Sequence, residues 1–362
     1  MISEEQAREA LREVKDPGPN KKLGEVRLLK GVVVDGGRVR VELEQPAVGY
    51  LYKDDIANAV QNALISAGAA PGSIDIQWTL NVVGRVAKPD QPRLPGVKNI
   101  IAVAAGKGGV GKSTVASNLA LALQKLGARV GLYDADVYGP SMPTMLGPPE
   151  LAASTDASKK IIPAVHHGLK VMSVGFFIER EGAVVWRGPM VHKLLQQFLE
   201  DVDWGTLDYL VMDLPPGTGD AQLSLSQLVP ISGAVMVTTP QEVAIIDVIK
   251  AIAMFKKVEI PLLGIVENMS GYVCPSCGHH DDIFSRGGGR KLAQDENTMF
   301  LGEVPIEGKI RYGGDVGRPV VVGAPEGVHA KIFLEIASKV ATKLATQLLS
   351  GPRRSPGLVT IK

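Results

Sequence analysis

Cysteine is nearly absent from this chain of 362 residues, which contains only Cys274 and Cys277. Two cysteines this close together cannot form the disulfide framework of a small secreted domain. No run of about 18 uninterrupted apolar residues occurs, so no transmembrane helix is expected. The amphipathic N-terminal stretch, MISEEQAREALREVKD, does not have the basic segment followed by an apolar run that a secretory signal requires. We therefore expect a cytoplasmic protein.

An excess of charge of one sign is also missing. The chain has 39 basic and 38 acidic residues, for a net charge of +1. This balance gives no reason to expect nucleic acid or an anionic membrane as a partner. The hydrophobic content of 45% is ordinary for a globular protein, and the length allows two domains.

Residues 1–88 have the pattern of a small α+β domain. Two strands, Gly31–Val34 and Arg38–Leu43, flank the turn sequence Asp35-Gly36-Gly37. Helical spacing covers Ser3–Lys15 and Ile56–Ala67, and a further strand is predicted at Ile74–Val83. A proline-rich stretch then predicts a linker over residues 89–98.

Residues 99–350 alternate between apolar strands and helices, and residues 351–362 are expected to form a loose tail. This alternation predicts an α/β domain with a mainly parallel sheet covered by helices on both faces, whose ligands bind at the carboxyl ends of the strands. Strands are predicted at Ile100–Ala105, Arg129–Tyr133, Leu169–Val174, Tyr209–Met212, Ala234–Thr238, Leu262–Val266 and Phe300–Val304. Helices are predicted at Thr114–Leu126, Val191–Glu200, Val243–Lys256 and Val328–Leu349.

The sequence GKGGVGKST lies between the first of these strands and the first helix, as a phosphate-binding loop requires. Its glycines let backbone N–H groups turn toward phosphate oxygens, and the helix N-terminus adds positive potential. Lys112 is expected to reach the β- and γ-phosphates and Ser113 to bind Mg²⁺. Lys107 either points toward a partner's nucleotide or is a solvated surface lysine. The predicted nucleotide-binding residues are Gly106, Lys107, Gly108, Gly109, Val110, Gly111, Lys112, Ser113 and Thr114.

Acidic residues follow two other strands at the same predicted edge. Asp213 begins DLPPGTGD and is placed to hold Mg²⁺ or its waters. Asp136 is a candidate for orienting the attacking water, whereas Asp134 either contacts Mg²⁺ waters or caps its loop. Asn268, after a further strand, either reads an adenine edge with its amide or forms a turn.

The cysteine pair lies in YVCPSCGHHDD and has three readings. A redox dithiol favours a helix start at the first cysteine, and none is evident here. A zinc site recruiting His279 and His280 conflicts with the usual H-x₃₋₅-H spacing. A site shared by two chains across a two-fold axis supplies four thiolates, enough for one [4Fe–4S] cluster. Lys107, if it points to a partner, indicates the same assembly.

Several longer motifs together resemble the Mrp/ApbC-type iron–sulfur cluster carrier ATPases. They are GKGGVGKST, DADVYGPSMPTMLG, DLPPGTGD, TTPQEVAIIDVIKAI, GIVENMSGYVCPSCG and FSRGGGRKLA, in order from about residue 99 to about residue 345. The phosphate loop is similar to that of the MinD, ParA and nitrogenase iron-protein class. The resemblance implies a homodimer with one [4Fe–4S] cluster on paired Cys274 and Cys277, slow ATP hydrolysis, and cluster delivery to apo-proteins. It also implies that Lys107 reaches the nucleotide of the other subunit and that ATP is preferred over GTP.

Residues 1–88 resemble the SufT/PaaD-like domain that is often fused ahead of this ATPase. The chain departs from its relatives at two places, one in this domain and one in the ATPase domain. QPAVGY, residues 45–50, lacks the cysteine that relatives often carry, which favours a docking or stabilising role for the domain. Ile249 stands where relatives usually have arginine.

The main alternative function is a ParA/MinD-like spatial organiser with a zinc or structural cysteine pair. A nitrogenase-like electron carrier would instead hold its cluster with cysteines well apart in sequence.

Overall fold

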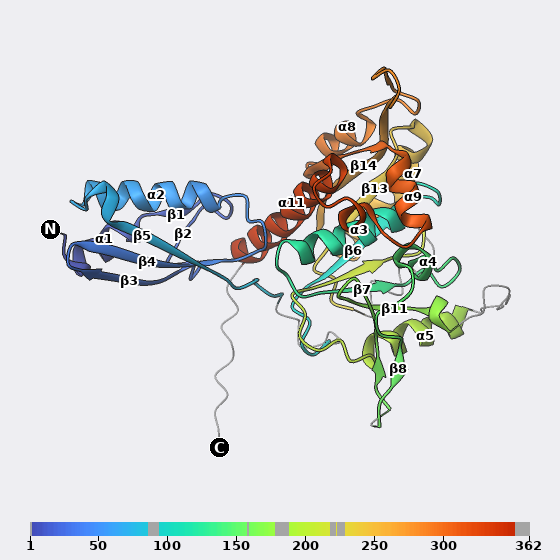
Figure 1. Ribbon diagram of the computed structural model, residues 1–362, viewed down its shortest axis with the longest axis horizontal. Coiled ribbons are helices and arrows are strands. Elements are labelled where there is room, and N and C mark those ends of the chain that lie inside the picture. The colour runs from blue at the N-terminus through green and yellow to red at the C-terminus, as the bar shows by residue number, and fades with distance from the viewer. Residues whose placement is uncertain are drawn as a thin grey trace. The chain divides into compact units, whose positions relative to one another are not determined.

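The computed structural model describes residues 2–85, 94–157, 159–177, 188–217, 222 and 229–351, and its elements are labelled in Figure 1. The chain divides into two units, residues 1–88 with 341–362 and residues 89–340. The sequence boundaries placed helix α11 (Val328–Ser350) wholly in the second domain, but its end groups with the first unit. Residues 89–93 of the expected linker and 352–362 of the expected tail lie outside the described residues.

The first unit is the expected α+β arrangement. Ser3 caps helix α1 (Glu4–Arg12), because its Oγ accepts from the Gln6 N–H while the Gln6 side chain accepts from the Ser3 N–H. Strands β3 (Leu29–Asp35) and β4 (Arg38–Gln45) pair antiparallel, and β5 (Ile74–Leu80) joins β4 in parallel. The other elements are β1 (Lys15–Asp16), β2 (Lys21–Lys22), α2 (Lys53–Ser66) and a 3₁₀ turn at Pro71–Ser73.

The second unit is built on a nine-stranded sheet of order β10-β11-β7-β12-β6-β13-β14-β15, with β16 paired to β14. Among the described strand pairs of this sheet only β10–β11 and β14–β15 are antiparallel, which confirms the mainly parallel sheet. The strands are β6 (Ile100–Ala105), β7 (Val130–Asp134), β10 (Ala164–His166), β11 (Leu169–Ser173), β12 (Tyr209–Asp213), β13 (Gly233–Thr238), β14 (Leu262–Val273), β15 (His280–Asp281) and β16 (Phe300–Ile306).

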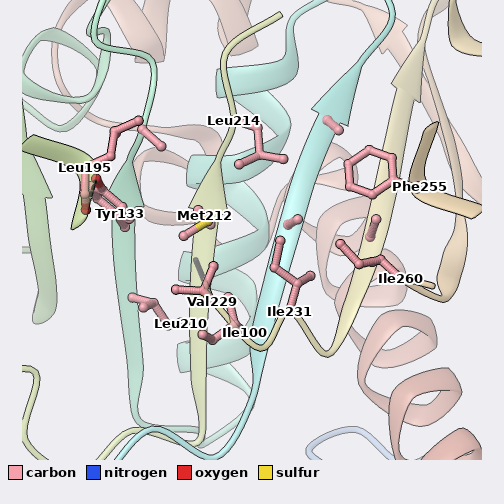
Figure 2. Packing of buried hydrophobic residues seen from close by; sticks show 14 of the residues in the cluster. Ile100, Tyr133, Leu195, Leu210, Met212, Leu214, Val229, Ile231, Phe255 and Ile260 are labelled. Atoms are coloured by element: carbon pink, nitrogen blue, oxygen red, sulfur yellow. Dashed lines mark hydrogen bonds between the residues drawn. The ribbon is translucent and has the colours of Figure 1, made fainter. Parts of the chain in front are cut away.

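Helices cover both faces of this sheet. Figure 2 shows α3 (Lys112–Lys125) behind the strands, while the labelled core side chains, from Leu195 of α5 to Phe255 of α7, lie in front. Within the described residues no helix combines the length and apolar character needed to cross a membrane. The remaining elements are α4 (Met142–Leu146), α5 (Gly188–Glu200), α7 (Glu242–Lys257), α8 (Gly288–Asp295), α9 (Gly308–Asp315), α10 (Val320–Gly323), a 3₁₀ turn at Val174–Phe176, and the ribbon β8 (Ser154–Thr155) with β9 (Ile161–Ile162).

The central strands are buried on both faces because they are apolar throughout. Every residue of β6, IIAVAA, is buried, and β13 is buried in the same way. On one face, Ile100, Met212 and Ile231 pack in a single cluster with α5 and α7 (Figure 2). This packing fixes the strand ends, and so it fixes the loops that carry the polar motifs.

Candidate nucleotide site and cysteine hairpin

The phosphate loop joins the end of β6 at Ala105 to the start of α3 at Lys112, as the sequence predicted. Gly111, the residue before the helix, has a φ of +81°, a left-handed conformation that favours glycine. A Cβ at this position would also lie 2.1 Å from the Asn268 side-chain nitrogen. Both facts make glycine necessary at the last position of the loop.

Lys112 and Ser113 both bind Asp213, which ends the neighbouring strand β12. The Lys112 ammonium lies 2.6 Å from Asp213 Oδ1, and the Ser113 hydroxyl donates to Asp213 Oδ2 at 2.6 Å. Asp136 Oδ2 lies 3.8 Å from the same ammonium. The side chains of Lys112 and Asp213 are almost completely buried, so charge neutralisation is needed to keep them there. The tertiary fold therefore brings four of the predicted site residues together.

This arrangement fits a bound magnesium ion. Mg²⁺ prefers oxygen ligands, and a hydroxyl and a carboxylate already lie side by side at the start of α3. When bound, the ion would neutralise charge on the phosphate oxygens. Among the described residues no group of three or more histidine, cysteine, aspartate or glutamate side chains forms a metal site.

Asp134, at the end of β7, holds the chain that follows it. Its Oδ2 accepts from the Ser173 hydroxyl and from the N–H groups of Ser141 and Met142, at 2.9–3.2 Å. Burial, and then the nearby Asp213 carboxylate, raise the pKa of Asp134 to about 7. Of the two roles predicted from sequence, these contacts describe the capping role. Ser173, which the sequence analysis missed, lies one residue before the end of the strand predicted at Leu169–Val174, and this position was the only available signal.

Asn268 supports the phosphate loop from strand β14. Its amide nitrogen donates to the Val110 carbonyl oxygen at 2.8 Å, and the side chain is buried. Its predicted contact with adenine stays a prediction. The preceding residue, Glu267, was not predicted to act, yet it is fully buried and accepts from the Ser270 hydroxyl and from the N–H groups of Gly287 and Gly289. This carboxylate thereby ties β14 to the start of α8.

The two cysteines lie at the turn between β14 and β15, in a hairpin that projects from the upper end of the sheet in Figure 1. Strand β14 was expected to end at Val266, but it continues to Val273, directly before Cys274. The Cys274 N–H donates to the His279 carbonyl at 2.9 Å, and the Gly278 N–H donates to the Cys274 carbonyl at 2.8 Å, closing a tight turn. The sequence had suggested only a loop here.

The two cysteines differ in their exposure to solvent. Cys277 is exposed and Cys274 is half-buried. The N–H groups of Ser276 and Cys277 point at the Cys274 sulfur and lower its pKa, which favours the thiolate that binds metals. His279 and His280 are also exposed, and they do not join the cysteines in any group of three or more potential ligands in the described part of the chain. Each chain thus offers two cysteine side chains at one tip.

Other predicted positions have less specific surroundings. Lys107 is half-buried, with no hydrogen bond or ion pair within the described residues, and Gly108 and Gly109 are exposed. The Thr114 carbonyl accepts from the side chains of Ser117 and Asn118. Residues 218–220, the end of DLPPGTGD, lie outside the described residues. Ile249 lies on the exposed side of α7, where its contacts do not explain the replacement of arginine.

The strand–loop–helix geometry and the parallel sheet define a P-loop NTPase. Residues 96–341 match the family of the NUBPL iron-transfer P-loop NTPases, and residues 4–76 match a family of iron–sulfur cluster assembly proteins. The chain belongs to the iron–sulfur cluster carrier family of P-loop NTPases, with an N-terminal iron–sulfur assembly domain. The resemblance seen in the sequence and the expected fold class are both confirmed.

Individual relatives agree with this placement. An iron–sulfur cluster carrier protein of Haemophilus influenzae is 44% identical over 344 residues, covering 94% of this chain and 92% of that protein. One from Escherichia coli is 46% identical over 309 residues, covering 85% and 84%. A nucleotide-binding protein of Archaeoglobus fulgidus, solved in complex with ADP, is 39% identical with a TM-score of 0.56. That match covers 65% of this chain and 91% of the solved chain.

Proposed function

We propose that this protein carries a [4Fe–4S] cluster between two copies of the chain and delivers it to apo-proteins. The observation that carries the proposal is the hairpin tip, where Cys277 is exposed and Cys274 half-buried, and where the described residues form no group of three or more potential ligands. Two such tips related by a two-fold axis supply the four thiolates that a cluster takes. An exposed, four-residue ligand loop also suits a cargo that must leave.

We further propose that the phosphate loop binds ATP with Mg²⁺ and hydrolyses it slowly. Lys112 would bind the β- and γ-phosphates, exchanging its contact with Asp213 for phosphate oxygens, while Ser113 and Asp213 would hold the ion. Asp136 would orient the attacking water. Burial raises the pKa of Asp136, and the nearby Lys112 ammonium opposes this shift. Lys107, which has no hydrogen bond or ion pair within the described residues, would reach the partner's nucleotide.

Strand β14 supplies a physical link between the nucleotide and the cluster. Asn268 contacts the phosphate loop, and the same strand runs on to Val273, next to the first cysteine. Met269 and Gly271, between these points, have φ values of +58° and +73°, and the pairing with β16 shifts register there. An irregular strand of this kind can adopt a second arrangement more easily than a regular one. ATP binding would thus reposition the hairpin.

Anaerobic reconstitution with iron and sulfide tests the cluster. The wild-type protein should bind about four iron atoms per dimer, as one cluster on four thiolates requires. Cys277→Ala should lose this iron, whereas Ser276→Ala, in the same exposed turn, should keep it. Replacing His279 and His280 by alanine should also leave the iron content unchanged. One tightly bound zinc per monomer, without a visible chromophore, would contradict the proposal and favour the spatial-organiser alternative.

Cluster transfer tests the coupling to ATP. Transfer to an apo-protein that accepts a [4Fe–4S] cluster is followed with and without Mg-ATP, for the wild type and for Lys112→Ala. The wild-type rate should respond to ATP and the variant rate should not. If both proteins transfer at the same rate in every condition, nucleotide and cluster are uncoupled.

The N-terminal unit is proposed to dock or stabilise rather than to bind metal. The segment that lacks the cysteine of its relatives is packed into this unit, because Ala47 and Val48 are fully buried. The Tyr50 hydroxyl donates to the buried Asp16 carboxylate at 2.6 Å. These contacts support a structural role for residues 45–50. Iron binding by the purified full-length Cys274→Ala, Cys277→Ala double variant would contradict the structural role of this unit.

A further inference from the structure

We propose that a cavity between α9 and α10 binds a peptide segment in which an apolar residue stands next to an acidic one, presented by a protein partner of the carrier. The choice of a protein partner rests on the proposed function. The cavity itself does not, because none of the residues that line it belongs to the phosphate loop or the cysteine hairpin.

The cavity has a volume of about 490 Å³, and several apolar residues line it. Tyr312 and Val316, from the end of α9 and the turn after it, contribute apolar surface that is 60% and 45% exposed. Val320, the first residue of α10, also lines the cavity and is buried. Large apolar side chains left open to water beside a cavity are characteristic of binding sites. The space suits an aliphatic or aromatic side chain with its neighbours.

Three basic residues, Lys309, Arg311 and Arg318, line the same cavity. Arg311 is paired with Asp315. The Glu307 carboxylate accepts from the Lys309 N–H and lies near His329. Within the described residues, neither the Lys309 ammonium nor the Arg318 guanidinium has a hydrogen bond or ion pair. Two cations without partners beside an apolar cavity are complementary to a carboxylate next to an apolar group. This complementarity selects the acidic peptide over a basic or neutral one.

The cavity is connected to the nucleotide site through α4. Helix α9 packs against α4, with Gly314 facing the Met145 side chain. The chain segments that follow these two helices also approach each other closely, because a Cβ added at Gly317 would lie only 2.2 Å from the Gly147 Cα. The start of α4 is held by the Asp134 carboxylate, which accepts from Ser141 and Met142. A movement of the loop after Asp134 would therefore reach the cavity through packed backbone.

This connection makes peptide binding dependent on the nucleotide. If Mg-ATP shifts α4, it changes the affinity for the peptide, and by linkage the peptide changes the affinity for Mg-ATP by the same factor. The site would then report the nucleotide state of the carrier to the partner that docks on it.

The test is selection from a library of random seven-residue peptides on the full-length, cluster-free protein, followed by affinity measurement on the enriched peptides. These peptides should pair an aspartate or glutamate with a leucine or an aromatic residue. The Lys309→Ala, Arg318→Ala double variant should bind them at least about tenfold more weakly, as expected for the loss of two charged contacts. Lys257→Ala, an exposed lysine on α7, should bind as the wild type does. Mg-ATP should change the wild-type affinity about fivefold or more.

Failure to enrich any peptide, enrichment without the acidic and apolar pair, or equal binding by the double variant would each overturn the proposal. Circular dichroism and an unchanged ATPase rate will show that the double variant is folded. Because the peptide measurement uses no iron, it is independent of reconstitution. A protein that binds these peptides but no cluster would refute the proposed function alone, and the converse result would refute only the cavity.

Discussion

Lys112 and Asp213 form a buried ion pair, with 2.6 Å between the ammonium nitrogen and Oδ1, at the point where a nucleotide's phosphates are expected. Neither group is accessible enough for water to compensate its charge, so each depends on the other. Phosphate oxygens offer the lysine a second set of negative partners. The phosphate loop is thus held in shape by a contact that nucleotide binding has to rearrange.

Asp213→Asn should impair ATP hydrolysis. The amide keeps the size of the side chain but removes the charge that neutralises Lys112 and attracts Mg²⁺. We expect the steady-state rate of phosphate release to fall by about tenfold or more, with weaker dependence on Mg²⁺. Asp295→Asn, an exposed acid on α8, serves as the control. A rate unchanged in the Asp213 variant would show that this carboxylate takes no part in hydrolysis.

Asn268→Ala should weaken nucleotide binding. The variant loses the hydrogen bond to the Val110 carbonyl and leaves that buried oxygen without this partner, which costs about 1–3 kcal/mol. We therefore expect the dissociation constant for ATP to rise about tenfold in isothermal titration. The exposed Asn62→Ala, in the first unit, is the matched control. Equal affinities for the wild type and Asn268→Ala would remove this residue from the site.

Glu267→Gln should loosen the junction between β14 and α8. Both carboxylate oxygens of Glu267 accept backbone N–H groups, and a glutamine can offer only one acceptor oxygen to them. The expected loss is about 1–3 kcal/mol of unfolding free energy. Hydrogen exchange should be faster at residues 285–289 than in the wild type. The control Glu326→Gln replaces an exposed glutamate, and matching stability and exchange in both variants would contradict the role assigned to Glu267.

Asp208 should make stability depend on pH. Burial alone would raise its pKa, but hydrogen bonds from Arg129 and Lys98 overcome this and hold the pKa at about 2. The pKa of an aspartate in an unfolded chain is about 3.9. The stabilisation by the Asp208 charge is therefore complete above that pH and is lost as the pH falls toward 2. Asp208→Asn should lower Tm at pH 7 by about 2–4 °C, which corresponds to roughly 1 kcal/mol.

The difference in Tm between Asp208→Asn and the wild type is the useful readout, because other carboxylates titrate in the same range. It should be largest at neutral pH and should shrink below about pH 4. Glu326→Gln, an exposed substitution, should show no such trend. A difference that stays constant down to pH 2 would mean that the charge of Asp208 does not stabilise the fold.

Much of the second unit follows from the sequence alone. The apolar run of β6 predicts its burial on both faces, and the glycines and Lys112 that follow it predict the phosphate loop. These predictions succeed because they depend on residues close together in the chain, where burial of an apolar run and the conformational freedom of glycine act locally. The spacing of Cys274 and Cys277 also involves only neighbouring residues, and the metal site that it indicates stays a prediction.

Tertiary structure decided what depends on distant residues. The sequence predicted that β14 ends at Val266, because polar residues follow. The strand in fact continues. The buried Glu267 carboxylate is tolerated there because N–H groups about twenty positions further along the chain donate hydrogen bonds to it. The same holds for Asn268, whose contact with Val110 no local pattern specifies. The meeting of Lys112 with Asp213 requires two strands to lie side by side. Short-range patterns therefore determined which groups the protein carries, and the packing of the sheet determined which of them meet.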